Sequence, residues 1–153
     1  MNIVVPKDQL SKALALTQSV VERKTTMPIL ANILLTVREK GLQLAATDLE
    51  ITALTSVDAK VQSTGSTTVN AKVFSDIVRE LPEGDVSLSL SEGERLEILS
   101  GQSRFRMVGV SAEEFPSLPG ITIDVSHKVS GRQFLEMITK TLYSVSHDET
   151  NKK

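Results

Sequence analysis

The 153-residue sequence contains no cysteine and no tryptophan, and it has only one tyrosine and two histidines. Without cysteine, the chain cannot form a disulfide scaffold, use a thiol nucleophile or bind a metal through sulfur. A reducing cytoplasm is therefore the expected compartment. No stretch approaches the roughly 18 apolar residues that span a bilayer, and the N-terminus lacks the basic region of a signal peptide. We expect a protein without membrane contacts.

Residues suited to catalysis or metal binding are scarce. His127 and His147 have no ligand cluster around them, so each is expected to be an ordinary surface or helix-end histidine. Asp48 and Glu50 could form a carboxylate pair on a strand, although Asp48 is better explained as a residue that binds the backbone of a turn. The sequence has no Gly-rich phosphate loop and no nucleophile elbow. We expect no catalytic residue, no metal and no cofactor.

The apolar residues follow a repeated order of strands and helices. A short strand over 1–5 precedes a helix over 7–22, and β-rich stretches follow at 29–37, 42–46, 51–61 and 67–69. Asn70 is a plausible N-cap for a second helix. The apolar face of that helix is predicted to consist of Val73, Phe74, Ile77, Val78 and Leu81.

After this helix the pattern returns to alternation. Strands are predicted around 86–90, 96–98 and 105–107, and a Pro-containing linker follows at 114–120. The next segment begins again with a strand over 121–129. Ser130 and Gln133 then form a capping box for a third helix, whose apolar residues are Phe134, Leu135, Ile138, Leu142 and Val145.

The three predicted helices begin near residues 7, 71 and 131, a period of about 60 residues. Each unit comprises a strand, a helix and three strands, and such a tandem arrangement predicts units that complete each other's sheets. The third unit contains only one strand and one helix, which cannot bury their apolar faces alone. We therefore expect that the natural chain continues. The expected domains are 1–119 and a truncated second domain over 120–153.

Charge is distributed unevenly, although the net charge is only −2. The helical segments and the residues just after the first helix contain eight basic and five acidic residues, whereas the remainder contains nine basic and fourteen acidic ones. This difference is equally compatible with ordinary solvated helix faces. If the helices share one face, that face would suit contact with a phosphate backbone and not base recognition.

The stretch Arg104-Phe105-Arg106-Met107-Val108 is predicted to be the last strand of its unit, and so the edge of a sheet. Two interpretations are open for its apolar residues. Phe105 and Met107 could simply fill the core. Alternatively, the strand could pair with another subunit, with apolar anchors beside arginines that meet acidic partners.

Several motifs together resemble the bacterial DNA sliding clamp family, the beta subunit of DNA polymerase III. They are TMPILANILL (26–35), ATDLE (46–50), LPEG (81–84), SGQSRF (100–105), EFPSLP (114–119) and YSVSHDET (143–150). The resemblance implies an α+β DNA-clamp (processivity) fold, with two strand-helix-three-strand units per domain and helices on one face of antiparallel sheets. It also implies a ring of two subunits of three domains each, with helices around duplex DNA.

The resemblance also implies roles for particular residues. Lys24, Lys72 and Arg79 stand at positions that contact DNA, and Asp148 stands at another such position, where its carboxylate would repel phosphate. The subunit interface would contain Arg104, Phe105 and Met107. Gln102 replaces a common arginine of this edge, so one ion pair of the interface is expected to be missing.

After Thr150 the sequence departs from the family pattern and reads Asn151-Lys152-Lys153. The leading hypothesis is a non-catalytic processivity factor of bacterial DNA replication, or its N-terminal part, located in the cytoplasm with the nucleoid. Its expected partners are double-stranded DNA, a second clamp subunit, the replicative polymerase and the clamp loader. The alternative is a naturally short clamp-like protein that caps a full-length subunit and blocks ring closure.

Overall fold

The computed structural model describes residues 1–21, 27–118 and 126–145. The chain divides into two compact units, Met1–Leu118 and Pro119–Lys153, each of which is described by itself. No helix in the described ranges is both long enough and apolar enough to cross a membrane.

The first half of unit 1 contains one helix and five strands. Strand β1 (Asn2–Pro6) leads directly into helix α1 (Lys7–Gln18), and its last residue, Pro6, has an extended backbone and is the N-cap of the helix. A 3-10 turn, Pro28–Ala31, precedes the remaining strands. These are β2 (Asn32–Arg38), β3 (Gly41–Thr47), β4 (Thr52–Val57) and β5 (Lys60–Ser63).

The second half also begins with a strand and a helix, but three strands follow its helix in place of four. Strand β6 (Gly65–Asn70) leads into helix α2 (Ala71–Glu80), which Asn70 caps by accepting a hydrogen bond from the backbone N–H of Val73. Three strands and a short 3-10 turn follow: β7 (Asp85–Ser91), β8 (Arg95–Ser100), β9 (Ser103–Val108) and Ala112–Glu114. The predicted starts of both helices are confirmed.

The two halves exchange their first strands. One antiparallel sheet has the order β5-β1-β7-β8-β9 and the other has the order β4-β3-β2-β6. Strand β1 of the first half therefore joins the last three strands of the second half, and β6 joins β2, β3 and β4. This confirms that the units complete each other's sheets. Strands β4 and β9 occupy equivalent outer edges.

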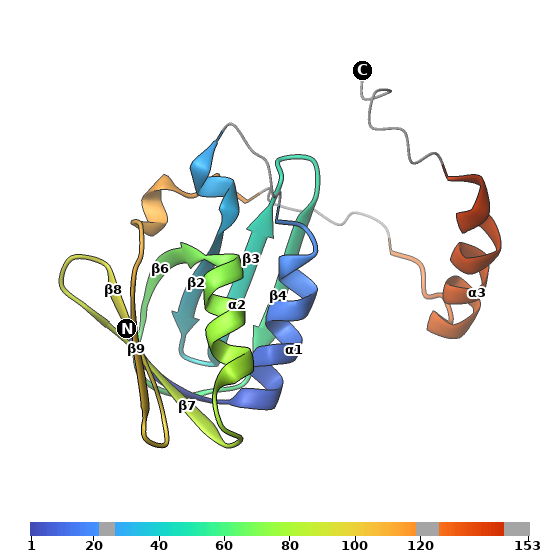
Figure 1. The fold of residues 1–153 in the computed structure, drawn as a ribbon. Helices are drawn as coiled ribbons and strands as arrows, with labels where there is room; N and C mark the ends of the chain where they lie inside the picture. Colours follow the sequence, from blue (N-terminus) through green and yellow to red (C-terminus); the bar gives the residue numbers. More distant parts are fainter. Residues whose placement is uncertain (22–26, 119–125, 146–153) are drawn as a thin grey trace. The chain divides into compact units, whose positions relative to one another are not determined.

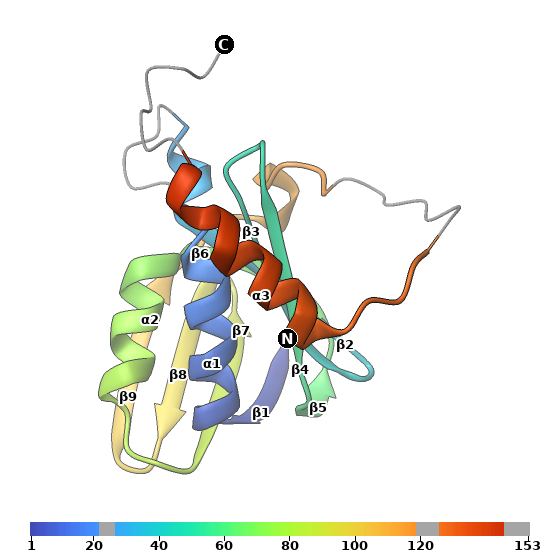
Figure 2. The same cartoon turned by 90° about the vertical axis from the view of Figure 1, so that its right-hand side faces the viewer.

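Helices α1 and α2 lie side by side and cover the sheets on one side (Figures 1 and 2). Apolar residues of the two helices, Leu10, Leu14, Phe74 and Val78, are fully or almost fully buried. They belong to the same core as strand residues such as Ile3, Leu35, Leu44, Leu88 and Ile98. The core therefore couples the two helices and both sheets, through apolar burial.

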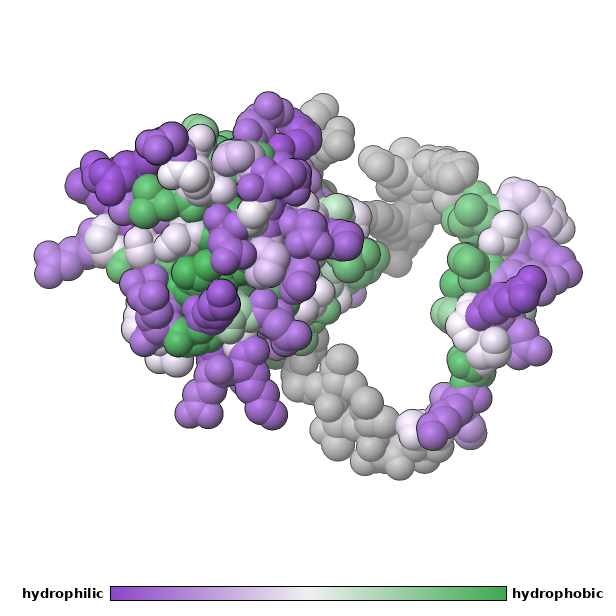
Figure 3. All heavy atoms as spheres, turned by 90° about the horizontal axis from the view of Figure 1, so that it is seen from below, coloured by the Kyte–Doolittle hydropathy of each residue, from purple (hydrophilic) through white to green (hydrophobic). Residues whose placement is uncertain are grey.

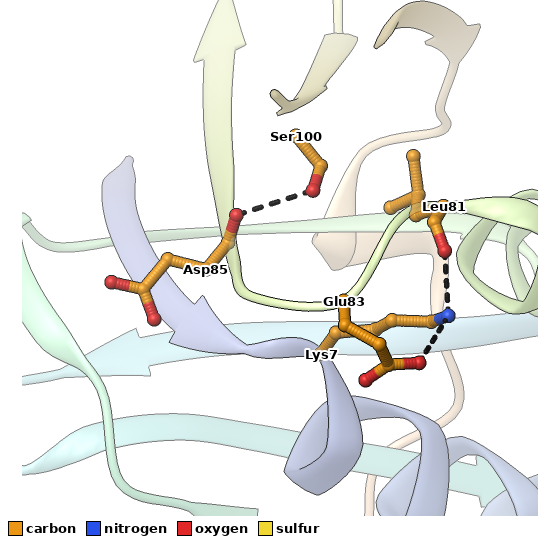
Figure 4. A network of polar contacts seen from close by, with 5 residues as sticks. All are labelled: Lys7, Leu81, Glu83, Asp85 and Ser100. Atoms are coloured by element: carbon orange, nitrogen blue, oxygen red, sulfur yellow. Dashed lines mark hydrogen bonds and ion pairs between the residues drawn. The ribbon is translucent and has the colours of Figure 1, made fainter. Parts of the chain in front are cut away.

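Figure 4 shows how the start of α1 is joined to the end of α2. The Lys7 ammonium donates to the Leu81 carbonyl at 2.5 Å and to the Glu83 carboxylate at 3.0 Å. The backbone N–H of Lys7 donates to the Gly84 carbonyl at 2.9 Å. Nearby, the Ser100 hydroxyl donates to the Asp85 carbonyl at 3.3 Å. Lys7 is thus a structural residue, and its side chain is only 13% exposed.

A second junction joins the two sheets near β6. Thr68 and Val110 form an isolated antiparallel bridge, and Gly109 donates its backbone N–H to the Glu94 carbonyl at 2.7 Å. The buried Thr67 hydroxyl donates to the Glu94 carboxylate at 2.5 Å. Glu94 reaches this position from the β7–β8 turn with a positive φ of 55°.

Several predicted boundaries are wrong. The strand predicted over 51–61 is two strands, because the chain leaves the sheet of β4 at Asp58 and enters the other sheet as β5. The strand predicted from residue 29 begins at Asn32, after the turn that starts at Pro28. Helix α1 ends at Gln18 and not at 22, and the strand predicted over 67–69 extends over Gly65–Asn70.

Unit 2 contains helix α3 (Gly131–Thr141) and a 3-10 turn, Leu142–Ser144. Most of the strand predicted over 121–129 lies outside the described residues, and residues 126–129 are not a strand. Helix α3 starts as predicted but without a capping box, since Ser130 makes no side-chain cap hydrogen bond. Its apolar residues are exposed, and Figure 3 shows them along one side of the helix.

Candidate functional site

The outward faces of α1 and α2 carry few free charges. Lys12 lies 3.6 Å from Asp8 on α1, and Lys7 is bound to Leu81 and Glu83 as described above. Four basic and three acidic residues lie on these two helices. The described helical surface of unit 1 is therefore close to neutral, and Arg23 and Lys24, which follow α1 in the sequence, contribute much of the surplus counted in the sequence.

Arg79 lies in the last turn of α2, and its side chain is 69% exposed. Its guanidinium group donates to Asp76 at 2.9 Å and lies 3.6 Å from Glu80. A phosphate group would have to compete with both carboxylates. The Arg79 side chain is exposed, but its positive charge is partly offset by two carboxylates of its own helix.

Lys72 lies in the first turn of α2, and its side chain is exposed. It lines an open groove of about 670 Å³ together with Gln18 and Ser19 at the end of α1 and Asn70 at the start of α2. Among the described residues, Lys72 makes no ion pair within 4.0 Å. The structure describes two of the residues predicted to contact DNA, Lys72 and Arg79. In the described part of the chain, carboxylates lie beside the positive charge of Arg79 but not beside that of Lys72.

Lys24 and Asp148 lie outside the described residues, so their predicted roles stay predictions. The other two residues predicted to contact DNA, Lys72 and Arg79, both lie on α2. They lie near opposite ends of this helix.

Strand β9 is the edge of its sheet, as predicted for the interface residues. Phe105 and Met107 face the core side, opposite Ile98 and Leu96 of β8. Met107 is buried, with 8% exposed, whereas Phe105 is 38% exposed. The core interpretation therefore applies to Met107, which is buried. Phe105 is compatible with the interface interpretation, because part of its ring is exposed at the edge.

Glu97 interacts with both arginines of the edge strand, Arg104 and Arg106. This role of Glu97 is not predicted from the sequence. Its carboxylate accepts a hydrogen bond from Arg106 at 3.0 Å and lies 3.5 Å from Arg104. The β8–β9 hairpin sets this geometry by pairing Glu97 with Arg106 and Leu99 with Arg104. The two-residue turn at Gly101-Gln102 could have revealed the pairing from the sequence, because the turn fixes the register.

Asp48 is a turn residue. Its carboxylate accepts hydrogen bonds from the backbone N–H groups of Glu50 at 3.0 Å and Ile51 at 2.6 Å. These bonds hold the β3–β4 turn, in which Leu49 has a positive φ of 76°. Within the described residues, no group of three His, Asp or Glu side chains could hold a metal ion. His127 is exposed, and His147 lies outside the described residues.

Comparison with known proteins identifies relatives over almost the whole chain. A family model described as the DNA polymerase III beta subunit, N-terminal domain, matches residues 1–119. The beta sliding clamp of Caulobacter vibrioides is 38% identical over 152 residues, which is 98% of this chain and 41% of that protein. The beta sliding clamp of Proteus mirabilis is 35% identical over 97% of this chain and 41% of its own length.

Solved structures show the same similarity. The DNA polymerase sliding clamp from Caulobacter crescentus has 37% identity and a TM-score of 0.90, and the alignment covers 97% of this chain and 41% of that one. The sliding clamp from Bacillus subtilis has 26% identity and a TM-score of 0.90, over 99% of this chain and 42% of its own. The chain spans about two fifths of the length of these relatives. With residues 1–119 matched, the chain belongs to the DNA polymerase III beta subunit family.

Proposed function

We propose that this chain supplies the N-terminal domain of a DNA sliding clamp, which encircles duplex DNA and tethers the replicative polymerase. The observation that carries this proposal is the family match over residues 1–119, together with two helices side by side on one side of two antiparallel sheets. In this role the protein is a non-catalytic factor of bacterial DNA replication in the cytoplasm, with the nucleoid. Residues 1–119 form the first clamp domain, and residues 120–153 begin the second.

The DNA-facing residues are Lys24, Lys72 and Arg79. Their contacts are with phosphates and carry no sequence information, since retention by a ring is topological and base-specific contacts would slow sliding. Asp148 would weaken such contacts by repelling phosphate. The exposed position of Lys72 supports its role, and the two carboxylates beside Arg79 reduce the contribution of that residue.

The subunit interface includes β9, where Arg104 and Phe105 are exposed and Met107 supports the strand from the core. The second subunit contacts this edge. The polymerase and the clamp loader bind parts of the clamp fold that lie outside these 153 residues.

Salt-dependent DNA binding tests this function. Binding of the 153-residue chain to a labelled duplex, measured by fluorescence anisotropy, should be weak and independent of sequence. With about three phosphate contacts, log K should fall with log salt with a slope of about −2 to −3. Lys72→Glu should weaken binding more than Arg79→Glu, because Arg79 is already paired with Asp76.

Lys40→Glu is the matched control, since Lys40 is an exposed lysine in the β2–β3 turn, outside both helices. This variant changes the net charge by the same amount. Equal weakening by Lys40→Glu and Lys72→Glu would show that only overall charge matters, and tight base-specific binding would also contradict the proposal.

The exposed ring of Phe105 at an open strand edge favours a second candidate function, in which the short chain caps a full-length clamp subunit and blocks ring closure. A pull-down with a full-length clamp tests it. A complex that Phe105→Ala abolishes supports capping, whereas no complex, or one that Phe105→Ala leaves unchanged, excludes it.

A further inference from the structure

Three charged residues of α2 share one face of the helix. Lys72, Asp76 and Arg79 follow each other at spacings of four and three residues, and residues at these spacings lie on the same side of a helix. The buried residues Phe74 and Val78 belong to the core, whereas the side chains of Asp76 and Arg79 are 44% and 69% exposed. Asp76 therefore lies between the two cations of α2, one turn from each.

Asp76 engages one of these two cations. Its carboxylate accepts a hydrogen bond from the Arg79 guanidinium at 2.9 Å, whereas Lys72 makes no ion pair within 4.0 Å among the described residues. The N–H donors of a guanidinium that bind a carboxylate are the same donors that bind a phosphate. An N–H group that donates to Asp76 is therefore not available to DNA until it leaves the carboxylate.

The pair of Asp76 and Arg79 lies on an exposed helix surface, where an ion pair contributes little to stability. Its larger consequence concerns what Arg79 can bind. When Arg79 moves from the carboxylate to a phosphate, it exchanges one anionic partner for another, so the gain in free energy is only the difference between the two contacts. The charge of Asp76 would in addition repel a phosphate that approaches this face.

We infer that Asp76 is a positioning residue that limits the contact between Arg79 and DNA. This inference rests on the proposed function, because it requires that the exposed face of α2 meets a duplex. Asp76 holds the arginine while no phosphate is near and takes it back when a phosphate moves away. The contact is therefore weak and easily released, which suits a protein that moves along DNA without recognising its sequence.

The variant Asp76→Asn tests this role, since it removes the charge and keeps the size of the side chain. The 153-residue variant should bind a labelled duplex about two- to fivefold more tightly than the wild type at low salt, the range expected for loss of one exposed ion pair. The slope of log K against log salt should become steeper by up to about 0.9, which corresponds to one more phosphate contact. Circular dichroism checks that the helix content is retained.

A double-mutant cycle separates positioning from simple repulsion. In the background of Arg79→Ala, the change Asp76→Asn should no longer tighten binding by the same factor, because the arginine that it releases is absent. An equal gain with and without Arg79 would mean that Asp76 only repels the duplex, and this outcome would overturn the inference.

Glu39→Gln is the matched control for net charge. Glu39 is an exposed carboxylate in the β2–β3 turn, outside both helices, and the variant changes the charge of the chain by the same amount. It should leave the affinity for the duplex unchanged. A gain equal to that of Asp76→Asn would show that total charge and not the position of Asp76 sets the affinity, which would also contradict the inference.

The same titrations distinguish failure of this inference from failure of the proposed function. If Lys72→Glu weakens binding but Asp76→Asn leaves the affinity and the salt slope unchanged, the inference is wrong and the proposed function stands. If neither the wild type nor Asp76→Asn binds the duplex at low salt, both are wrong.

Discussion

Phe74 and Phe134 are each the fourth residue of a helix, in α2 and α3 respectively, and their environments are opposite. Phe74 is fully buried in the core of unit 1, whereas Phe134 is 50% exposed. Leu10, the fourth residue of α1, is also fully buried. All three helices have an apolar fourth residue, and these residues differ in whether other parts of the structure cover them. An amphipathic sequence specifies a helix and its inner face, but burial requires the strands that cover that face.

The largest expected effect comes from removing the buried ring of Phe74. Phe74→Ala should lower the free energy of unfolding of unit 1 by about 3 to 5 kcal/mol, because it removes buried apolar surface and leaves a cavity. Urea unfolding followed by circular dichroism measures the change. The fluorescence of Tyr143 reports on unit 2, since Tyr143 is the only tyrosine and the sequence has no tryptophan.

Phe134→Ala is the matched control for this comparison. It should leave the unfolding transition of unit 1 unchanged, since Phe134 is not part of the core of unit 1. If Phe134→Ala lowered the free energy of unfolding of unit 1 as much as Phe74→Ala, α3 would be coupled to the core. The proposed difference between the two units would then be wrong.

A smaller effect is expected from two glycines. A Cβ atom at Gly109 would lie 2.6 Å from the Thr68 carbonyl oxygen and 2.8 Å from the Thr67 hydroxyl, whereas a Cβ at Gly131 would meet nothing within 4 Å. Gly109→Ala should therefore destabilise unit 1 by about 1 to 3 kcal/mol, as overpacking does. Gly131→Ala should leave the same thermal transition unchanged. Equal melting temperatures for Gly109→Ala and the wild type would mean that the junction between the two sheets is loosely packed.

The helix caps provide a third test. Asn70 accepts a hydrogen bond from Val73 N–H at 3.0 Å, whereas Ser130 makes no side-chain cap hydrogen bond. Asn70→Ala should cost about 1 kcal/mol of unit 1 stability. Ser130→Ala should not change the helix content of α3 at 222 nm. A loss of α3 signal in this variant would restore the capping box that the sequence predicts.

These contrasts explain how much of the fold can be predicted from the sequence. The starts of all three helices are predictable, because they depend on local periodicity and on residues next to each start, such as Pro6 and Asn70. The prediction of the apolar face of α2 is only partly correct, since Phe74, Val78 and Leu81 are buried but Val73 is 48% exposed. Burial depends on where a helix meets its neighbours.

Features that depend on pairing between residues far apart in the sequence are harder to predict from the sequence. The break between β4 and β5 follows from the pairing of β5 with β1, about 60 residues earlier in the sequence. Alternation of apolar residues continues through the break and so gives no signal. The junction of Thr67, Glu94 and Gly109 likewise depends on contacts between two halves of the chain.

The candidate site shows the same division. Resemblance and alternation place Lys72 on α2 and Arg104 and Phe105 on an edge strand. They do not reveal that Asp76 and Glu80 offset the charge of Arg79, although the spacing from Asp76 to Arg79 is typical of a helical ion pair. Phe105 and Met107 have the same parity on β9, so alternation alone does not reveal that Met107 is buried while Phe105 is 38% exposed.

The smallest expected effect concerns a feature that the two units share. Asp8 and Lys12 on α1 and Glu136 and Lys140 on α3 are exposed pairs spaced four residues apart, with N–O distances of 3.6 and 2.7 Å. Such pairs contribute about 0.2 to 0.5 kcal/mol to a helix, and salt screens them. Lys12→Ala and Lys140→Ala should therefore have equally small effects, measured by unfolding for α1 and by helix content for α3, and both effects should vanish in 1 M salt, a concentration at which the screening length is only about 3 Å. A large effect of Lys12→Ala alone would mean that the core of unit 1 amplifies surface charge, and the difference between the units would then extend beyond the burial of apolar side chains.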